Sequence, residues 1–331
     1  MKRRLLTSVA VSSIGLAVLT VAFTRRAHGA GETPAEPTHM TAAEFDALFK
    51  KNNNWGRWGK DDMMGTLNLI TDAKRKQAAS LVKTGITVSV EHDLSTEGSP
   101  DFPAGRFKQE VAPNFRTDTI FFQYHGAFVT HEDALCHYTY NDHVYNDRPL
   151  NTKACIPDIT NLKNGIVTRG IQIDIPRLKG VPYLEPESPV FVKDIEAWEK
   201  MAGVKVSAGD AIILRTGRWA RRIKVGPWDN IKSASGFDVT VGPWVKARDV
   251  ALASGDTTVE IHNVPPVVEG QLTPLHTLFI TGLGMPIIDD MDPEALAETC
   301  ARLHRWEFML VVAPLRIPGG TGGPVNPIAI F

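Results

Sequence analysis

The chain is poor in the features that mark several large classes of protein. Its 331 residues include only 3 cysteines, so at most one disulfide can form within the chain. Basic and acidic residues nearly balance, with 36 Lys and Arg against 37 Asp and Glu. This balance excludes the net positive field that non-specific nucleic-acid binding needs. A hydrophobic share of 43 % is enough for a full globular core.

Common catalytic and nucleotide-binding motifs are also missing. The chain has no G-x-S-x-G sequence, the motif of serine nucleophiles in α/β-hydrolases. Gly282-Leu283-Gly284 lacks the third glycine of a dinucleotide fingerprint, and residues 319–323 lack the Gly-Lys-Ser/Thr end of a phosphate-binding loop. We therefore expect neither a serine hydrolase mechanism nor a nucleotide cofactor.

The first 30 residues have the layout of an export signal. Basic residues at positions 2–4 precede an uncharged run at 5–23, and Ala27 and Gly29 suit cleavage after Gly29. The pattern predicts an exported protein, periplasmic or extracellular. The run of about 19 residues nearly suffices to cross a bilayer, so an uncleaved anchor facing the periplasm is the alternative, and the only membrane contact we expect.

Residues 31–331 show no break in composition, which favours a single domain. β-rich runs alternate with segments that carry helix caps, as is typical of α/β proteins. Expected strands cover residues 86–90, 119–124, 171–175, 211–215, 257–261 and 307–312. Expected helices start after Thr41 and Thr71, cover 194–201 and 245–253, and start again at 292–293. The long connections at 99–113 and 180–189 are expected to form lids or oligomer contacts.

The segment from His125 to His137 concentrates side chains that bind metal ions. On an extended chain His131 and Asp133 point to one face, about 6.6 Å apart along the strand. Imidazole and carboxylate suit Zn²⁺ or Mn²⁺, and the lack of thiolate disfavours a structural zinc. His137 stays on this side in either a strand or a helix, where it can bind metal or transfer protons. Polar surface or hydrogen-bonded core is the alternative interpretation.

The sequence Thr130-His131-Glu132-Asp133-Ala134-Leu135-Cys136-His137 resembles the T-H-x-D-x-x-x-H signature of metal-dependent cyclase-like hydrolases. This is the family of bacterial kynurenine formamidase and isatin hydrolase. Further blocks resemble a longer-chain branch of the family: residues 55–59, 65–68, 215–217, 275–276 and 319–327. The resemblance implies a swivelling β/α/β domain with a barrel-like central sheet and surrounding helices. It also implies one or two divalent ions, Zn²⁺ or Mn²⁺, and a homodimer or homotetramer.

Matching positions in the motif imply that His131 and Asp133 bind metal, with Asp133 able to bridge two ions, and that His137 transfers protons. The resemblance further implies a second ion, held by a distant histidine and a glutamate twelve residues beyond it. Here His276 is followed after thirteen residues by Asp289, which is the nearest equivalent. A shorter carboxylate reaches less far than a glutamate.

The chain departs from the family pattern at the first metal ligand. That ligand usually lies four residues before the histidine of the T-H pair, where this chain has Ala127. His125 shares the strand parity of His131, so it can take this place if the segment bulges.

Together these residues predict hydrolysis of a small amide, cyclic imide or lactone. A metal ion lowers the pKa of a bound water from about 15.7 towards roughly 7, and His137 would act as general acid and base. Trp55, Trp58 and Phe128 are candidates for an aromatic substrate pocket, with core packing as the alternative. Arg215 is a candidate for binding a substrate carboxylate, with a structural ion pair as the alternative.

Two other functions remain open at this point. The first is an exported metal-binding or ligand-binding protein that keeps the fold without turnover, because fold alone does not secure activity. The second is a metal-dependent lyase or dehydratase in which His137 removes a proton from carbon.

Overall fold

The computed structural model describes residues 36–114, 116–126 and 128–331, all within one compact unit, Ala35–Phe331. The predicted export signal at 1–30 and the departure from the family pattern at Ala127 lie outside these residues. Among the described helices, none combines the length and apolar character needed to cross a bilayer.

A nine-stranded sheet forms the centre of the fold. In chain order its strands are β1 (Thr87–Ser89), β4 (His131–Asp133), β7 (Ile166–Asp174), β9 (Ala211–Arg215), β11 (Leu252–Gly255), β12 (Ile287–Asp289), β13 (Glu307–Val312), β14 (Gly322–Pro324) and β15 (Ile328–Ile330). Their order across the sheet is β1-β15-β13-β7-β9-β11-β12-β4-β14. The middle strands β7, β9, β11 and β12 run parallel, and the strands on both sides of them pair antiparallel.

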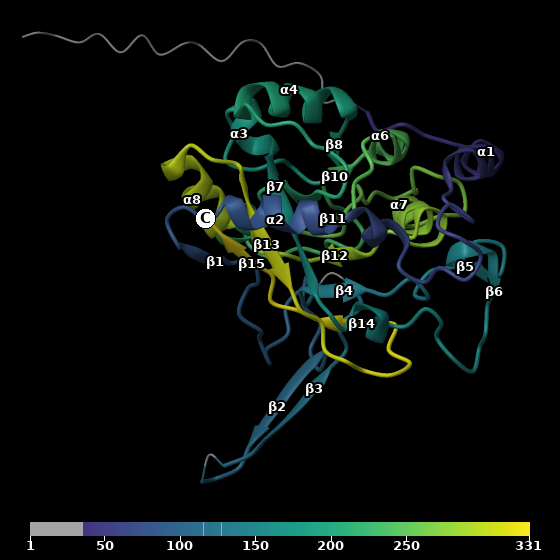
Figure 1. Cartoon of the computed structure of the whole chain (residues 1–331). Helices are drawn as coiled ribbons and strands as arrows, with labels where there is room; N and C mark the ends of the chain where they lie inside the picture. Colours follow the sequence, from purple (N-terminus) through teal and green to yellow (C-terminus); the bar gives the residue numbers. More distant parts are fainter. Residues whose placement is uncertain (1–35, 115, 127) are drawn as a thin grey trace, which may run out of the picture. The chain divides into compact units, whose positions relative to one another are not determined.

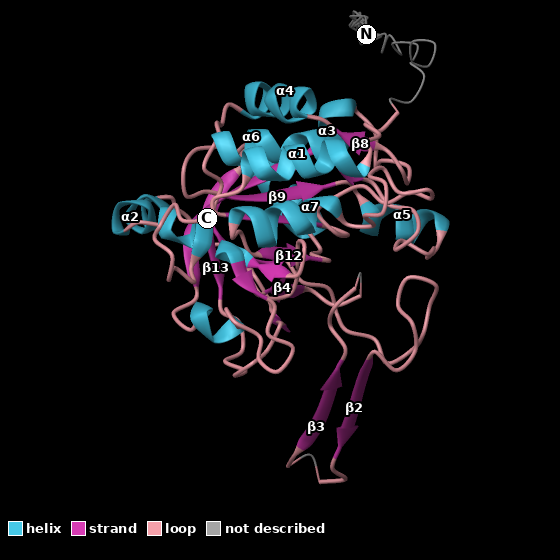
Figure 2. Cartoon of the chain, turned by 90° about the vertical axis from the view of Figure 1, so that its right-hand side faces the viewer, coloured by secondary structure: helices cyan, strands magenta, loops and turns pink. Residues whose placement is uncertain are grey.

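Helices pack around this sheet, and α3, α4 and α6 lie on the same side of it in both views (Figures 1 and 2). The α-helices are α1 (Ala42–Asn52), α2 (Asp72–Ser80), α3 (Ile175–Lys179), α4 (Val192–Ala202), α5 (Arg218–Val225), α6 (Gly242–Ala247), α7 (Pro274–His276) and α8 (Glu294–Leu303). The 3₁₀-helices are η1 (Gly65–Leu69), η2 (Tyr145–Asp147), η3 (Ile159–Leu162) and η4 (Val239–Val241), and η5 (Thr277–Leu283) is a π-helix. The predicted α/β class is confirmed.

Three two-stranded sheets complete the architecture. They pair β2 (Phe107–Val111) with β3 (Asp118–Phe122), β5 (His143–Val144) with β6 (Arg148–Pro149), and β8 (Pro189–Val190) with β10 (Gly236–Phe237). The first of them occupies part of the long connection at 99–113.

The middle strands β9, β11 and β12 are buried on both faces of the sheet. In β9, Ile212 and Leu214 belong to the apolar cluster on one face, whereas Ala211 and Ile213 belong to the cluster on the other. A strand buried on both faces needs a continuous apolar run, which is what this segment provides.

The helices predicted after Thr41 and Thr71 and at 194–201 are confirmed, and residues at their ends cap them. The Thr41 hydroxyl accepts a hydrogen bond from the Glu44 backbone N–H, and the Glu44 carboxylate accepts one from the Thr41 backbone N–H, as a capping box requires. Helix α2 begins after Thr71, and α4 ends at Gly203 in the left-handed conformation.

Two predicted elements around residue 250 are wrong. The expected helix at 245–253 ends at Ala247, and its last residues belong to β11, which pairs with both β9 and β12. The expected strand at 257–261 is not one. Strand β11 ends at Gly255. The next residue, Asp256, accepts hydrogen bonds on its carboxylate from the backbone N–H groups of Thr216 and Gly217, and the chain leaves the central sheet here.

One disulfide joins Cys136 to Cys155, and Cys300 is buried and free. This is the single bridge that the cysteine count permits. It ties the residue before His137 to the loop that precedes η3.

Candidate metal centre

Strand β4 brings the motif into the sheet beside β12. These strands pair antiparallel, with His131 opposite Asp289 and Glu132 opposite Ile288. Directly opposed residues share a face of the sheet, so His131 and Asp289 become neighbours although they are far apart in sequence. Ile288 packs in the apolar cluster on the other face, so Glu132 points away from the motif's other side chains, as strand alternation predicts.

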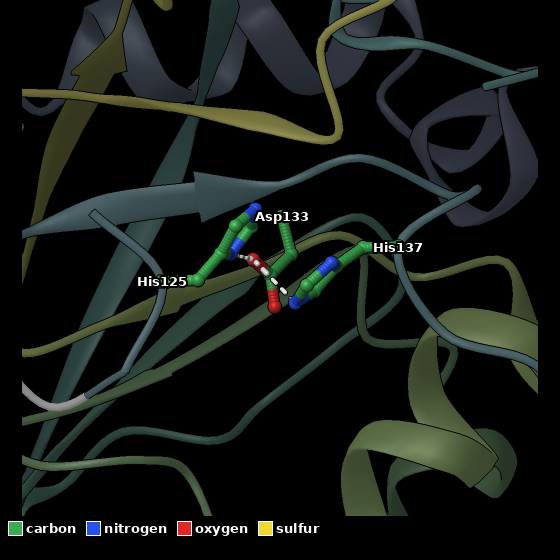
Figure 3. Close-up of side chains that lie close together, drawn as sticks. All are labelled: His125, Asp133 and His137. Carbon is green, nitrogen blue, oxygen red and sulfur yellow. Dashed lines mark ion pairs between the residues drawn. The ribbon is translucent and has the colours of Figure 1, made fainter. Parts of the chain in front are cut away.

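His125 and His137 approach Asp133 from the two ends of the motif (Figure 3). His125 Nδ1 lies 3.1 Å and His137 Nε2 lies 3.8 Å from Asp133 Oδ1. The two imidazole rings stack with their centroids 3.6 Å apart. His137 reaches this position because the chain turns after β4, where its backbone N–H donates to the Ala134 carbonyl. His125 is held by a 2.8 Å hydrogen bond between its Nε2 and the Thr321 hydroxyl.

His276 at the end of α7 completes the cluster. Its Nε2 lies 2.9 Å from Asp289 Oδ2 and 3.8 Å from Asp133 Oδ2. Glu260 holds the ring from behind, with Oε1 at 2.5 Å from His276 Nδ1 and Oε2 accepting the His276 backbone N–H at 2.9 Å. This network assigns the Nδ1 proton to the Glu260 side, which directs Nε2 at the two aspartates.

Burial and neighbouring charges shift the pKa values of these groups in different directions. Burial lowers the pKa of His137 to about 4, so its imidazole is neutral at pH 7. Burial by itself would raise the pKa of Asp133, but the neighbouring imidazoles, foremost that of His137, hold it well below its usual range. For His276, burial favours a lower pKa, yet Glu260 and Asp289 raise it well above the usual value.

The residues present fit a divalent cation. Both carboxylate oxygens of Asp133, and Oδ1 of Asp289, are buried and accept no hydrogen bond from any described residue. A buried anionic oxygen without a partner is costly, and a bound cation removes that cost. Two sets of three ligand atoms lie within 4.8 Å of one another: His125, Asp133 and His137 form one, and His131, Asp133 and Asp289 form the other.

The cluster forms the polar end of a cavity of about 390 Å³. The other walls are mainly apolar: Ile231, Ile261, Val264, Pro266, Val267 and Leu272. Val264 and Leu272 are 71 % and 75 % exposed, which leaves apolar surface open to solvent at this cavity. Tyr138 also lines it, and its hydroxyl accepts a hydrogen bond from the Thr273 hydroxyl. The dimensions and lining suit a small organic molecule.

The predicted aromatic contacts do not reach this cavity. The Trp55 indole donates to the Thr281 carbonyl, and Trp58 lies under the Arg57 guanidinium. Phe128 is buried in a separate small apolar cluster. None of the three aromatic residues lines the cavity that contains the ligand cluster. Trp55 packs against Phe49 and Phe128 against Phe102, whereas the contact of Trp58 is with the exposed Arg57.

Arg215 likewise lies outside the cavity lining. Its guanidinium binds Asp174 at 2.8 Å and both carboxylate oxygens of Glu294 at 2.7 and 3.0 Å. The arginine is therefore part of a structural ion-pair network.

Sequence reasoning missed Glu260. The sequence predicts a strand at this position, whereas the structure has an irregular segment in which both Glu260 carboxylate oxygens contact His276. The signal was present, because a glutamate between Val259 and Ile261 in an apolar run must find a partner if the run is buried.

Comparison with known proteins identifies the class of this fold and site. The chain matches the sequence profile of the Cyclase family over residues 72–259, more than half of its length, and it belongs to that family.

Solved structures agree with this assignment. A protein described as a novel cyclase has 28 % sequence identity and a TM-score of 0.73, with 86 % of this chain and 99 % of that one covered. This likeness confirms the predicted cyclase-like fold, a curled, half-barrel sheet surrounded by helices.

Two isatin hydrolases share the fold at lower identity. Isatin hydrolase A from Ralstonia solanacearum has 20 % identity and a TM-score of 0.52, covering 74 % of this chain and 91 % of that one. Isatin hydrolase A from Labrenzia aggregata, bound to benzyl benzoate, has 21 % identity and a TM-score of 0.50, covering 76 % and 94 %. No curated protein matches the chain.

Proposed function

We propose that this protein is a metal-dependent hydrolase that cleaves a C–N or C–O bond of a small amide, cyclic imide or lactone. The observation that carries the proposal is the convergence of three imidazoles on the buried Asp133, whose carboxylate oxygens accept no hydrogen bond from any described residue. The fold shared with isatin hydrolases supports a cyclic amide as one substrate to test.

The proposed ligands are His131, Asp133 and Asp289 for one ion, and His125 with Asp133 for another. His276 adds a nitrogen beside Asp289. A nitrogen and oxygen donor set of this kind suits Zn²⁺ or Mn²⁺. Such an ion supplies Lewis acidity: it lowers the pKa of a water and polarises a carbonyl oxygen.

His137 is the proposed proton-transfer residue. Its side chain lines the cavity, and its depressed pKa keeps the ring unprotonated at pH 7, the state in which a general base starts. The ring would take a proton from the attacking water and return it to the leaving nitrogen or oxygen. The apolar walls would exclude bulk water and pack against the substrate.

The function is tested with purified protein, elemental analysis and a panel of aryl formamides, cyclic imides and lactones. We expect a bound divalent metal and hydrolysis of at least one panel member, with activity lost on chelation and restored by added Zn²⁺ or Mn²⁺. Metal binding without turnover of any member would indicate a binding protein. A product that has lost water would indicate a dehydratase.

Glu260 provides a further prediction about this site. Replacing it by glutamine removes the charge that orients His276 while keeping its size, so metal affinity should fall about 10- to 100-fold. Isothermal titration calorimetry with the metal ion measures the change in affinity. Glu269→Gln is the control, because the exposed Glu269 carboxylate accepts a hydrogen bond from the Ala42 backbone N–H and does not line the cavity, so affinity should stay unchanged. Equal affinities for the two variants would contradict the proposed role.

We also propose export from the cytoplasm. The N-terminal pattern predicts it, and the Cys136–Cys155 disulfide supports it, because such bonds persist in oxidising compartments.

A further inference from the structure

The β2–β3 hairpin extends away from the central sheet (Figures 1 and 2). Its base is anchored by Phe107, which is buried in a small apolar cluster. Further out, Val111, Ile120 and Phe121 are 45 %, 50 % and 44 % exposed. Neither outer edge pairs with another strand in the described part of the chain. A lone hairpin is marginally stable in water, and its open edges are templates for pairing with another chain.

Hydrogen bonds at the two ends of the hairpin show which backbone groups of β2 point outward. The Gln123 N–H donates to the Arg106 carbonyl at 2.7 Å, and the Ala112 N–H donates to the Thr117 carbonyl at 2.9 Å. Antiparallel ladders alternate, so the even-numbered residues of β2 bond to β3. The odd-numbered residues 107, 109 and 111 therefore present their N–H and C=O groups to the outer edge.

We propose that β2 pairs antiparallel with β2 of a second copy of this chain, about a twofold axis at Gln109. The outward groups of residues 107, 109 and 111 then bond to those of the partner's Val111, the partner's Gln109 and the partner's Phe107. Both copies use the same surface, so the assembly closes as a dimer.

Charge selects this register. With the axis at Gln109, Lys108 lies opposite the partner's Glu110. The twofold axis generates the same pair a second time, between Glu110 and the partner's Lys108. These positions are not hydrogen-bonded to each other, so their side chains approach most closely. An axis at residue 107 would instead set Lys108 against the partner's Arg106, which is repulsive. Self-pairing of β3 about Ile120 would place Asp118 opposite the partner's Phe122 and form no ion pair.

This inference rests on the hairpin alone and is independent of the metal centre. It assigns a surface to the homo-oligomer expected from the sequence, and it joins two hairpins into one four-stranded sheet. Val111, which is exposed near the hairpin tip, would then lie opposite the partner's Phe107, at the buried base of the partner's hairpin.

A charge exchange tests the register by sedimentation velocity of the purified protein over a range of concentrations. We expect the unaltered protein to be dimeric, and Lys108→Glu or Glu110→Lys to raise the dimer dissociation constant at least about tenfold, since two attractive pairs become repulsive. The double variant restores both pairs and should restore the dimer. Lys60→Glu, an exposed charge reversal outside the hairpin, should change nothing.

Cross-linking tests the axis directly. Opposed residues of a hydrogen-bonded antiparallel pair lie about 5.5 Å apart at Cα, within disulfide range. Gln109→Cys should therefore form an intermolecular disulfide under mild oxidation, and Thr119→Cys on β3 should not. A monomeric unaltered protein, a dimer that resists Lys108→Glu, a double variant that stays monomeric, or equal cross-linking of the two cysteine variants would each overturn the proposal.

Discussion

Asp133→Asn is expected to abolish both metal binding and turnover. Asp133 belongs to both groups of candidate ligands, so loss of its charge weakens every ion the site could hold. A catalytic ion supplies several kcal/mol of transition-state stabilisation, so kcat/KM should fall about 1,000-fold or more. Elemental analysis and the hydrolysis rate on a panel substrate measure the two effects.

Glu132→Gln is the matched control for this variant. Glu132 is the adjacent carboxyl on β4 but faces the other side of the sheet, opposite Ile288. Burial raises its pKa to about 8, so it is mostly neutral at pH 7 and glutamine is a close substitute. This variant should keep both metal and rate. An Asp133→Asn protein that binds metal and turns over normally would rule out the proposed centre.

His137→Ala is expected to slow turnover while the metal stays bound. Loss of a general acid and base lowers kcat by about 10² to 10⁴. His137 also lies in one of the two groups of candidate ligands, so metal content is the decisive measurement. His131→Ala is the comparison, because His131 is a proposed ligand and its loss should release metal. If His137→Ala releases metal as His131→Ala does, His137 is a ligand and its proposed role in proton transfer is wrong.

Part of the site follows from spacing along one segment. Alternation on a strand predicted that His131 and Asp133 share a face and that Glu132 points away, and the structure agrees. It also places His137 beside Asp133, although by a turn and not by a regular strand or helix. The approach of His125 to Asp133 matches the substitution expected from its parity, and its role as a ligand stays a prediction.

The remaining side chains of the site depend on contacts between distant segments. Asp289 meets His131 through the register of β12 against β4, and Glu260 meets His276 because the chain leaves the sheet after β11. Neither contact can be derived from local periodicity. Local periodicity also gives no sign of the ion pairs of Arg215, because its partners Asp174 and Glu294 belong to other elements of the fold.

The amino-acid sequence by itself determined the α/β class, the helix caps and the spacing of the His131 motif, because each depends on interactions between residues a few positions apart. The tertiary structure alone decided which strand lies beside the motif, which cysteines pair, and which cavity the histidines enter. These outcomes depend on strand register and on packing between segments far apart in the chain, where no short-range spacing carries the information.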